Sequence, residues 1–486
     1  MGEASPHRIR DVSGGEAFIY PYTAMPAKYS LLLQNCHISD HGSIVKIPGY
    51  AKVNADAVEE ALSTGFEFKK SNGTTQILAA GGGKIFKVDG TSLTAIKTGL
   101  DTGANVSFAM MNDICLMGNG VNTPMKHDGT TVSALGGTPP ATAFKFHVHK
   151  NRVWVLERSN KLLATHSALN DPEDYTGAGS GYIDFKFVLK KGDELLDVKT
   201  FIDMIVFYFR NHIAIYSGNT PSGEGSDFRL VQLIEDVGIL DTGLAQGVGT
   251  DMAFASDAGI KSFRQVVTTG NMSIESLSKK IDPVLREDIA TSGVQSLVHY
   301  PKRGWILAKV GNTIHIYSYT WKAWSRITGA DINNMFLSND GTLYLCGTGY
   351  LYRYDSGWDF AGDDIAYKWK TGWLPISRTG EYVYPKIAEI IAVPNTQISF
   401  DITVTYDLGV LSDANIFQLE LGGAVTLVDE ATNWDGVDPL DETVYARYRF
   451  PVFGRGRTMQ FEFSNTSSVG PIVLTDLIIH QKKGRF

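Results

Sequence analysis

The sequence has few cysteines, no long hydrophobic run and no excess of positive charge. Its three cysteines, Cys36, Cys115 and Cys346, are widely separated and show no metal-ligand spacing, which argues against a disulfide framework and a cysteine-based zinc site. The first 20 residues contain no apolar core segment, and no uncharged stretch approaches the roughly 20 residues needed to cross a bilayer. We therefore expect synthesis in a reducing cytosol, without a signal peptide or membrane insertion.

The charge balance excludes one class of function. Lys and Arg number 44 against 52 Asp and Glu, giving a net charge of −8. A protein that grips nucleic acid over its whole surface needs the opposite balance. Any contact with DNA should therefore be local or weak.

The composition favours β-structure. The chain has 486 residues and 43% hydrophobic content, enough for two or three cores. It also has 50 glycines and 11% aromatic residues, a balance that suits many short strands joined by tight turns.

Short apolar runs separated by Gly, Asn or Asp turns recur from Leu31 onward, as in β-hairpins. The clearest example joins 75–80 to 84–90 through the turn Gly81-Gly82-Gly83. Similar groups of runs cover 107–118, 144–156, 204–217, 252–263, 294–319 and 335–354.

Some of these runs are echoed elsewhere in the chain. Residues 211–217 (NHIAIYS) resemble 312–318 (NTIHIYS). Residues 84–89 (KIFKVD) resemble 350–355 (YLYRYD), and 257–263 (DAGIKSF) is a looser copy. Hairpins of one design, repeated at about 40 to 50 residues or multiples of that spacing, are typical of β-propeller blades. We predict about six or seven blades.

Other segments depart from this pattern. Residues 1–30 are polar and then rich in Pro and Tyr, which indicates an extended arm that packs on something else. Residues 54–62 (NADAVEEAL) and 278–290 (SKKIDPVLREDIA) are expected as short helical inserts. After a turn-rich join at 357–364, longer strands are expected at 387–393, 398–406, 416–421, 445–452, 459–463 and 472–479.

The predicted fold class is therefore all-β. It consists of an extended N-terminal arm over 1–30, a β-propeller over 31–360 and a C-terminal β-sandwich-like domain over 361–486. Trp154, at the centre of the run Val153-Trp154-Val155, is expected to pack between blades. A cut near Gly362 is expected to leave a folded propeller and to abolish assembly of copies.

Few residues suggest chemistry. His147 and His149 lie on one face of a strand, the spacing of a two-histidine metal arm, but no third ligand cluster lies nearby in sequence. Residues 338–342 (SNDGT) are similar to the Asp-box turn of sialidases, yet they are one residue short and better explained as an Asp-Gly hairpin turn. No GxSxG, P-loop or HExxH motif is present. We expect no enzyme activity, no cofactor and no metal, and we assign no catalytic or binding residue.

Charge is uneven near the end of the chain. Residues 429–442 contain six carboxylates, and only Glu462 and Asp476 follow them. Adjacent acidic and basic surfaces suit head-to-tail contacts between copies, and solvated charges fit equally well. The basic residues that follow the acidic segment are Arg447, Arg449, Arg455, Arg457, Lys482, Lys483 and Arg485.

Four stretches are familiar in their order: 35–50 (NCHISDHGSIVKIPGY), 254–263 (FASDAGIKSF), 277–281 (LSKKI), and 367–373 (YKWKTGW) followed by Lys386. They resemble, in turn, the opening strand pair with its Pro-Gly turn, a blade, the short helix after it, and the entry to the C-terminal sandwich of one family. That family is the tail nozzle, or packaged-DNA-stabilisation, proteins of short-tailed phages. The resemblance spans residues 30–390.

The resemblance implies a hexameric ring in the virion tail, below the head-to-tail connector, that retains packaged duplex DNA and conducts it at ejection. The implied partners are the head-to-tail adaptor and other tail proteins, namely a spike or fibre and a plug or needle. It implies no catalysis, supplies no site residues and leaves the DNA-channel lining unknown. The alternatives are a glycan- or receptor-binding propeller on a virion or cell surface, and a propeller glycosidase.

Overall fold

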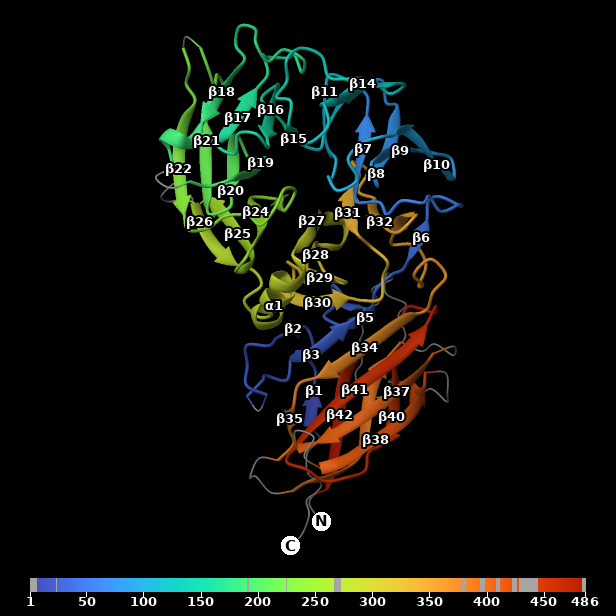
Figure 1. The fold of residues 1–486 in the computed structure, drawn as a ribbon. Helices are drawn as coiled ribbons and strands as arrows, with labels where there is room; N and C mark the ends of the chain where they lie inside the picture. Colours follow the sequence, from blue (N-terminus) through green and yellow to red (C-terminus); the bar gives the residue numbers. More distant parts are fainter. Residues whose placement is uncertain are drawn as a thin grey trace, which may run out of the picture.

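A computed structural model describes residues 7–22, 24–189, 192–223, 225–265, 272–377, 382–393, 398–407, 411–421, 426–427 and 445–482. Figure 1 shows a ring of small sheets joined to a two-sheet sandwich. We call the junction the waist: it is the region where residues 29–34 pair with 323–327 of the ring and with 365–371 of the sandwich. The all-β prediction of a propeller followed by a C-terminal sandwich is confirmed.

Five blades are each built from four consecutive antiparallel strands. Blade 1 contains β7 (Thr64–Lys69), β8 (Thr75–Gly81), β9 (Lys84–Asp89) and β10 (Ser92–Lys97). Blade 2 contains β11 (Ser107–Met111), β12 (Ile114–Gly118), β13 (Met125–His127) and β14 (Val132–Ala134). Blade 3 contains β15 (Ala143–His149), β16 (Arg152–Glu157), β17 (Leu163–His166) and β18 (Gly181–Asp184), followed by the 3-10 helix η1 (Phe185–Phe187). Blade 4 contains β19 (Leu195–Phe201), β20 (Met204–Phe209), β21 (His212–Ser217) and β22 (Arg229–Glu235). Blade 5 contains β23 (Ala245–Val248), β24 (Asp251–Ser256), β25 (Gly259–Gln265) and β26 (Met272–Ser276).

The last two blades involve the N-terminal part of the chain. Blade 6 contains β27 (Val294–Tyr300), β28 (Trp305–Val310), β29 (Thr313–Ser318) and β30 (Ala323–Ile327), with the 3-10 helix η2 (Pro301–Arg303). Blade 7 contains β31 (Asn334–Leu337), β32 (Leu343–Cys346) and β33 (Leu351–Tyr354), and its outer strand is β6 (Tyr50–Lys52). The innermost strands contact one another in blade order, and β31 contacts β7 to close the circle. The described residues therefore form seven blades.

The internal echoes fall on equivalent strands. Residues 211–217 and 312–318 give β21 and β29, the third strands of blades 4 and 6. Residues 84–89, 350–355 and 257–263 likewise lead to β9, β33 and β25, the third strands of blades 1, 7 and 5. The predicted propeller repeat is thus confirmed strand by strand.

The sandwich is formed by two sheets that share one apolar core. One sheet runs β39 (Thr426–Leu427), β40 (Ala446–Pro451), β36 (Tyr384–Ala392), β42 (Val473–Lys482), β5 (Ile44–Lys46) and β4 (Cys36–Ile38), with β1 (His7–Ile9) also paired to β42. The other contains β34 (Ile365–Thr371), β41 (Thr458–Ser467), β37 (Ser399–Tyr406) and β38 (Leu411–Glu420), with β35 (Leu374–Pro375) beside β41. The shared core includes Ile390 and Leu477 of the first sheet and Ile402, Phe461 and Phe463 of the second.

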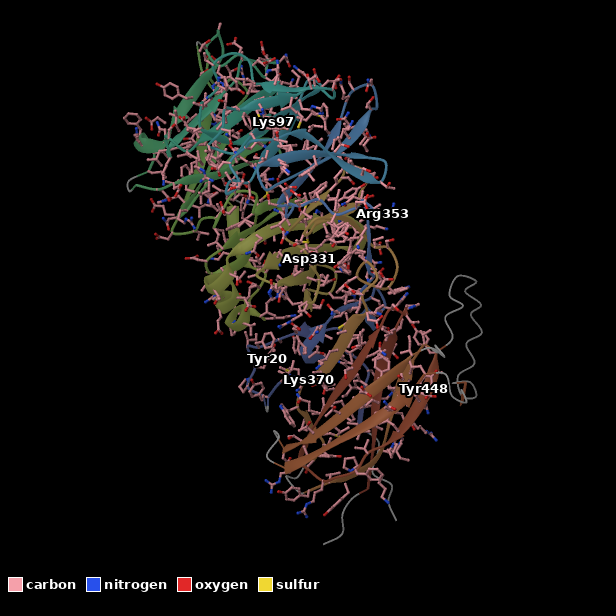
Figure 2. The ribbon with its side chains drawn as sticks, turned by 45° about the vertical axis from the view of Figure 1, so that its right-hand side comes forward. Tyr20, Lys97, Asp331, Arg353, Lys370 and Tyr448 are labelled. Carbon is pink, nitrogen blue, oxygen red and sulfur yellow. The ribbon has the colours of Figure 1, made fainter. Side chains whose placement is uncertain are left out.

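The N-terminal segment differs from its prediction. Strand β3 (Tyr29–Gln34) pairs with β34, β5 pairs with β42, and β4 pairs with β5. Residues 31–46 therefore extend the sandwich sheets and, through the pairing of β3 with β30, adjoin blade 6, but they do not begin the propeller as predicted. The arm before it packs on this same chain, because β1 pairs with β42 and β2 (Gly15–Glu16) pairs with β3. Figure 2 shows Tyr20 of the arm at the waist, where its ring lies 5.1 Å from that of Tyr29.

One helix prediction is confirmed and one is wrong. Helix α1 (Asp282–Ser292) starts with Pro283 in its first turn and buries Leu285 and Ile289. Residues 54–62 form bends and irregular chain instead, with an isolated bridge from Ala61 to Thr348. The side chain of Asn54 explains this, because it donates to Gly349 O at 3.0 Å and accepts from Leu351 N at 2.8 Å. Such fixed long-range bonds override the weak propensity of a nine-residue segment.

Candidate functional site

The waist is a continuous hydrogen-bonded sheet. Strand β3 is parallel to β30 of blade 6 at Gln34 and Arg326, and antiparallel to β34 of the sandwich from Ser30 to Gln34. Eleven strands are thereby joined, from β27 in the propeller to β38 in the sandwich (Figure 1). The two domains are linked by backbone hydrogen bonds as well as by the covalent chain.

A buried ion pair fixes the arm to this sheet. Glu16 is completely buried, and its carboxylate accepts from Arg326 Nε at 2.9 Å, Arg326 Nη2 at 2.8 Å and Leu33 N at 2.8 Å. The Arg326 guanidinium also lies 5.5 Å from the ring of Phe18. The buried Glu16 carboxylate thus has both a charge partner, the partly buried Arg326 guanidinium, and several hydrogen-bond donors.

Asn35 connects the two domains with one side chain. Its backbone has a positive φ of 54°, a conformation that asparagine tolerates better than most residues. Its amide donates to Thr328 O at 3.2 Å and to Ala366 O at 2.8 Å, and its carbonyl accepts from Thr328 N at 2.9 Å. The Asn35 side chain therefore bonds the end of blade 6 and the start of the sandwich together.

A polar cleft of about 540 Å³ opens beside the waist, between the β4–β5 hairpin and blades 6 and 7. On its wall Asp355 accepts from Lys302 at 2.8 Å and from Tyr300 at 3.4 Å, and it also bonds Arg303. His37 lies on its wall, with its ring 4.9 Å from that of Trp305. The cleft is therefore lined by several charged side chains: Asp40, Lys302, Arg303 and Asp355.

The charge states in this cleft are fixed. Burial opposes ionisation of Asp355, but the hydrogen bonds from Arg303 and Lys302 outweigh it and hold the pKa of the carboxyl below its usual value. Burial lowers the pKa of His37 to about 3. Near neutral pH the carboxylate is therefore charged and the imidazole neutral, so neither group titrates there. The arrangement suits a joint that holds two domains in place.

The two strand histidines bind a neighbouring blade. His147 Nε2 and His149 Nδ1 lie 2.8 and 3.0 Å from the hydroxyl of Thr200 in β19. Burial lowers the pKa of His149 to about 4. Within the described ranges, no three His, Cys, Asp or Glu side chains are grouped as metal ligands would be.

Sequence reasoning missed the buried carboxylate of Asp197 near this pair. It lies 3.0 Å from Lys145 Nζ and accepts from Gly243 N at 2.9 Å, so it links blades 3, 4 and 5. The sequence indicates this burial, because Asp197 lies within the apolar run Leu195-Leu196-Asp197-Val198. A charge buried in such a strand needs ionic or hydrogen-bond partners.

Other predicted residues are structural where they are described. Residues 338–342 form the expected turn between β31 and β32, with Ser338 Oγ accepting from Thr342 N at 3.1 Å. Trp154 is buried and packs on Phe207 and Phe228 of blade 4 at 5.4 and 5.6 Å, as predicted. Cys36, Cys115 and Cys346 are buried free thiols. The acidic segment 429–442 and residues Lys483 and Arg485 lie outside the described residues.

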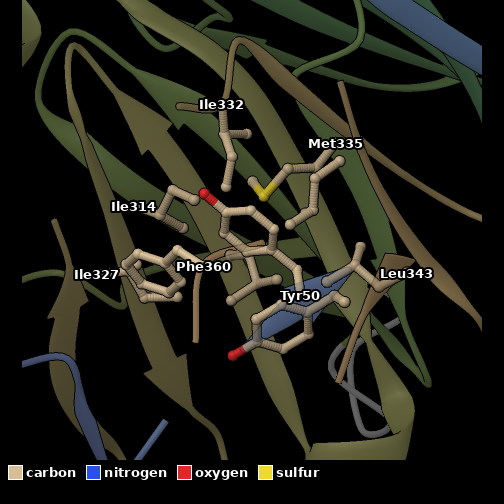
Figure 3. Close-up of a pocket in the computed structure, with 10 residues that line it drawn as sticks. Tyr50, Ile314, Ile327, Ile332, Met335, Leu343 and Phe360 are labelled. Atoms are coloured by element: carbon tan, nitrogen blue, oxygen red, sulfur yellow. The ribbon is translucent and has the colours of Figure 1, made fainter. Parts of the chain in front are cut away.

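A second, smaller pocket lies between blades 6 and 7. Its volume is about 10 Å³, no more than one water needs. The rings of Tyr50 and Phe360 stack at 4.9 Å on its wall, and Figure 3 shows them with Ile314, Ile327, Ile332, Met335 and Leu343. The pocket is a packing gap, and it lies where β6 completes blade 7. Among the described helices, none is long and apolar enough to cross a membrane.

No protein-family model matches the sequence, and no curated protein is similar to it. Solved structures are similar at low identity. Streptogramin B lyase is 11% identical with a TM-score of 0.42, over 63% of this chain and 95% of that one. BamB from Moraxella catarrhalis is 12% identical with a TM-score of 0.39, over 73% and 97%. The extracellular domain of a one component system of B. thetaiotaomicron is 13% identical with a TM-score of 0.46, and the match covers 70% of this chain but only 43% of that domain. Likeness at this level carries no information about activity or partners.

Proposed function

We propose that this chain is a structural, ring-forming protein of a short-tailed phage tail, placed below the head-to-tail connector. Six copies would surround a bore that retains packaged duplex DNA and conducts it at ejection. The partners would be the head-to-tail adaptor and other tail proteins, a spike or fibre and a plug or needle. The proposal places the protein in the virion after synthesis in the host cytoplasm.

The observation that carries this proposal is the continuous sheet through β3. Domains of one chain usually move relative to each other unless a large interface prevents it. Here β3 pairs with both β30 and β34, and Asn35 and Glu16 add buried side-chain bonds at the same place. Such a rigid body suits the wall of a conduit that must keep its shape during DNA passage. The order of the four stretches shared with nozzle proteins supports the same reading.

The charge supports a bore that does not grip DNA. A conduit must release its duplex quickly, and every cationic contact to phosphate adds salt-sensitive affinity. The net charge of −8 fits such a surface. We therefore expect the purified protein to bind free duplex DNA with a Kd weaker than about 10⁻⁶ M at physiological salt.

Two measurements test the proposal. Negative-stain electron microscopy with mass determination should show closed six-copy rings at high protein concentration. A protein that stays monomeric at every concentration contradicts the proposal. Fluorescence anisotropy with duplex DNA at two salt concentrations should give weak binding, whereas tight binding with a steep salt dependence would indicate a DNA-gripping surface instead.

A further inference from the structure

Aromatic and basic side chains gather at the end of the sandwich farthest from the propeller. Tyr384 of β36 pairs with Lys482 at the end of β42, whereas the other end of β42 pairs with β5 at the waist. Ile387 pairs with Pro451, the last residue of β40. The loop that follows β40 therefore lies at the same end. We call this surface the tip patch: Tyr382, Tyr384, Ile387, Phe453, Arg455 and Arg457.

The tip patch is exposed. Tyr382 and Tyr384 are each 42% exposed, Ile387 is 41% exposed and Phe453 is 61% exposed. The pairing of β36 with β42 shifts register between Pro385 and Ile387, and such a bulge re-aims the side chains beside it. Large apolar groups placed together at a surface usually mark a contact with another molecule.

The loop carrying the arginines is held in one shape. Asp407 Oδ1 accepts from Arg457 N at 2.7 Å and from Thr458 N at 3.0 Å. A Cβ on Gly454 would lie 2.5 Å from a ring carbon of Tyr406, so the loop backbone rests directly on that ring. The patch is therefore organised before any partner arrives, which reduces the entropy lost on binding.

The arginines of the patch contact its tyrosines, and the Arg455 side chain is hydrogen-bonded to Tyr384. The guanidiniums of Arg455 and Arg457 lie 5.2 and 5.0 Å from the ring centroid of Tyr382. Neither forms an ion pair with a carboxylate in the described part of the chain, whereas Arg449, which lies within β40 before this loop, is paired with Glu389 at 2.6 Å. Tyr and Arg sidechains stacked in this way are typical anchors of protein interfaces.

Charge identifies the partner. The whole chain has a net charge of −8 even with these arginines included, so its remaining residues together are more acidic still. We infer that the tip patch binds an acidic surface of a second copy of this chain, in a head-to-tail contact. The exposed apolar side chains of Ile387 and Phe453 favour a protein partner over DNA, because the charged phosphate backbone makes no favourable apolar contact with them. Head-to-tail contacts close into rings when the rotation between copies allows it, so this inference rests on the proposed function.

The test compares two double variants of the full chain by sedimentation velocity over a range of concentrations at low and high salt. The first carries Tyr382→Ala and Arg455→Glu. The matched control carries Tyr182→Ala, a tyrosine that is 65% exposed on blade 3, and Arg353→Glu, an exposed arginine on blade 7. Circular dichroism and the thermal midpoint check that both variants are folded. We expect the tip variant to weaken self-association by at least about 100-fold, and the control to assemble like wild type.

The possible outcomes separate this inference from the proposed function. Rings that form equally well in wild type and tip variant overturn the tip contact and leave the ring proposal standing. Open chains or dimers that are lost in the tip variant support the contact and contradict the closed ring. A monomeric wild type contradicts both. If the tip variant keeps its assembly but loses binding to duplex DNA in anisotropy, the patch is a nucleic-acid contact and the inference is wrong.

Discussion

Blades 1 to 5 and the waist both consist of short strands, but the strands of a blade are consecutive in sequence and those of the waist are not. Each of those blades uses four strands that follow one another in the chain. At the waist, β6 completes blade 7 next to β33, and β3 joins β30 to β34, so strands from the first 52 residues lie beside strands more than 270 residues later. A blade can therefore form locally, whereas the waist requires distant segments to meet, at a larger cost in chain entropy.

The first prediction is that the propeller can be isolated only if the N-terminal strands that pack in the sandwich are removed together with the C-terminal domain. A fragment 1–360 keeps Ile9, Val12, Leu33 and Ile44, which belong to the sandwich core. We expect it to aggregate, because these side chains lose their partners. A fragment 47–360 keeps all seven blades, including β6, and should be a folded monomer. Size exclusion and circular dichroism compare the two, and equal behaviour would break the distinction between blade and waist.

This changes the expectation drawn from the sequence, in which a cut near Gly362 was enough. The hairpin at 81–83, the third-strand echoes and helix α1 were predictable, because each depends on neighbours in sequence. The pairings of β3 and β6 leave no such local pattern. At the waist, Glu16 is a single carboxylate directly before the apolar residues Ala17-Phe18-Ile19, a pattern that indicates a buried charge. Nothing in the neighbouring sequence identifies Arg326 as its partner.

The second prediction concerns the buried ion pair of the waist. Glu16→Ala leaves the Arg326 charge without a partner and should lower the free energy of unfolding by about 3–5 kcal/mol. The double variant Glu16→Met with Arg326→Met should cost less than the sum of the single changes. Urea denaturation measures both. As a control, Arg8→Ala removes a partly exposed pair with Asp476 at 2.8 Å and should cost at most about 1 kcal/mol. An equal cost for Glu16→Ala and Arg8→Ala would show that the buried pair contributes nothing special.

The third prediction concerns the packing of Trp154 of blade 3 against blade 4, for comparison with the ion pair of the waist. Trp154 is only 1% exposed, so Trp154→Ala should lower the free energy of unfolding by about 3–5 kcal/mol through the cavity it leaves. Trp154→Phe should cost only about 1 kcal/mol, because the indole Nε1 has no hydrogen-bond partner among the described residues to lose. Thermal unfolding of both variants provides the check. Unchanged stability of Trp154→Ala would mean that the contact between blades 3 and 4 is dispensable.

The fourth prediction uses pH. Burial lowers the pKa of His37 to about 3, against about 6.5 in an unfolded chain. Below about pH 6.5 the unfolded state therefore binds a proton at His37 that the folded state does not bind. Lowering the pH from 7 to 5 should reduce the free energy of unfolding by about 2 kcal/mol through this group alone. His37→Phe should remove this part of the pH dependence. His166→Phe should act similarly in blade 3, since burial lowers the pKa of His166 to about 4. Unfolding measured at pH 7 and pH 5 that shows wild-type pH dependence in both variants would contradict the prediction.

The rigid waist is tested most directly by hydrogen exchange at β3 in the intact protein. Leu33 N donates to buried Glu16 at 2.8 Å, and Asn35 N donates to Arg326 O at 2.7 Å. If β3 fixes the two domains as one body, these amides should exchange only through global unfolding, as slowly as those of β24 in blade 5. Exchange at Leu33 and Asn35 that is orders of magnitude faster, while β30 and β34 remain protected, would show that the waist opens on its own and that propeller and sandwich move independently.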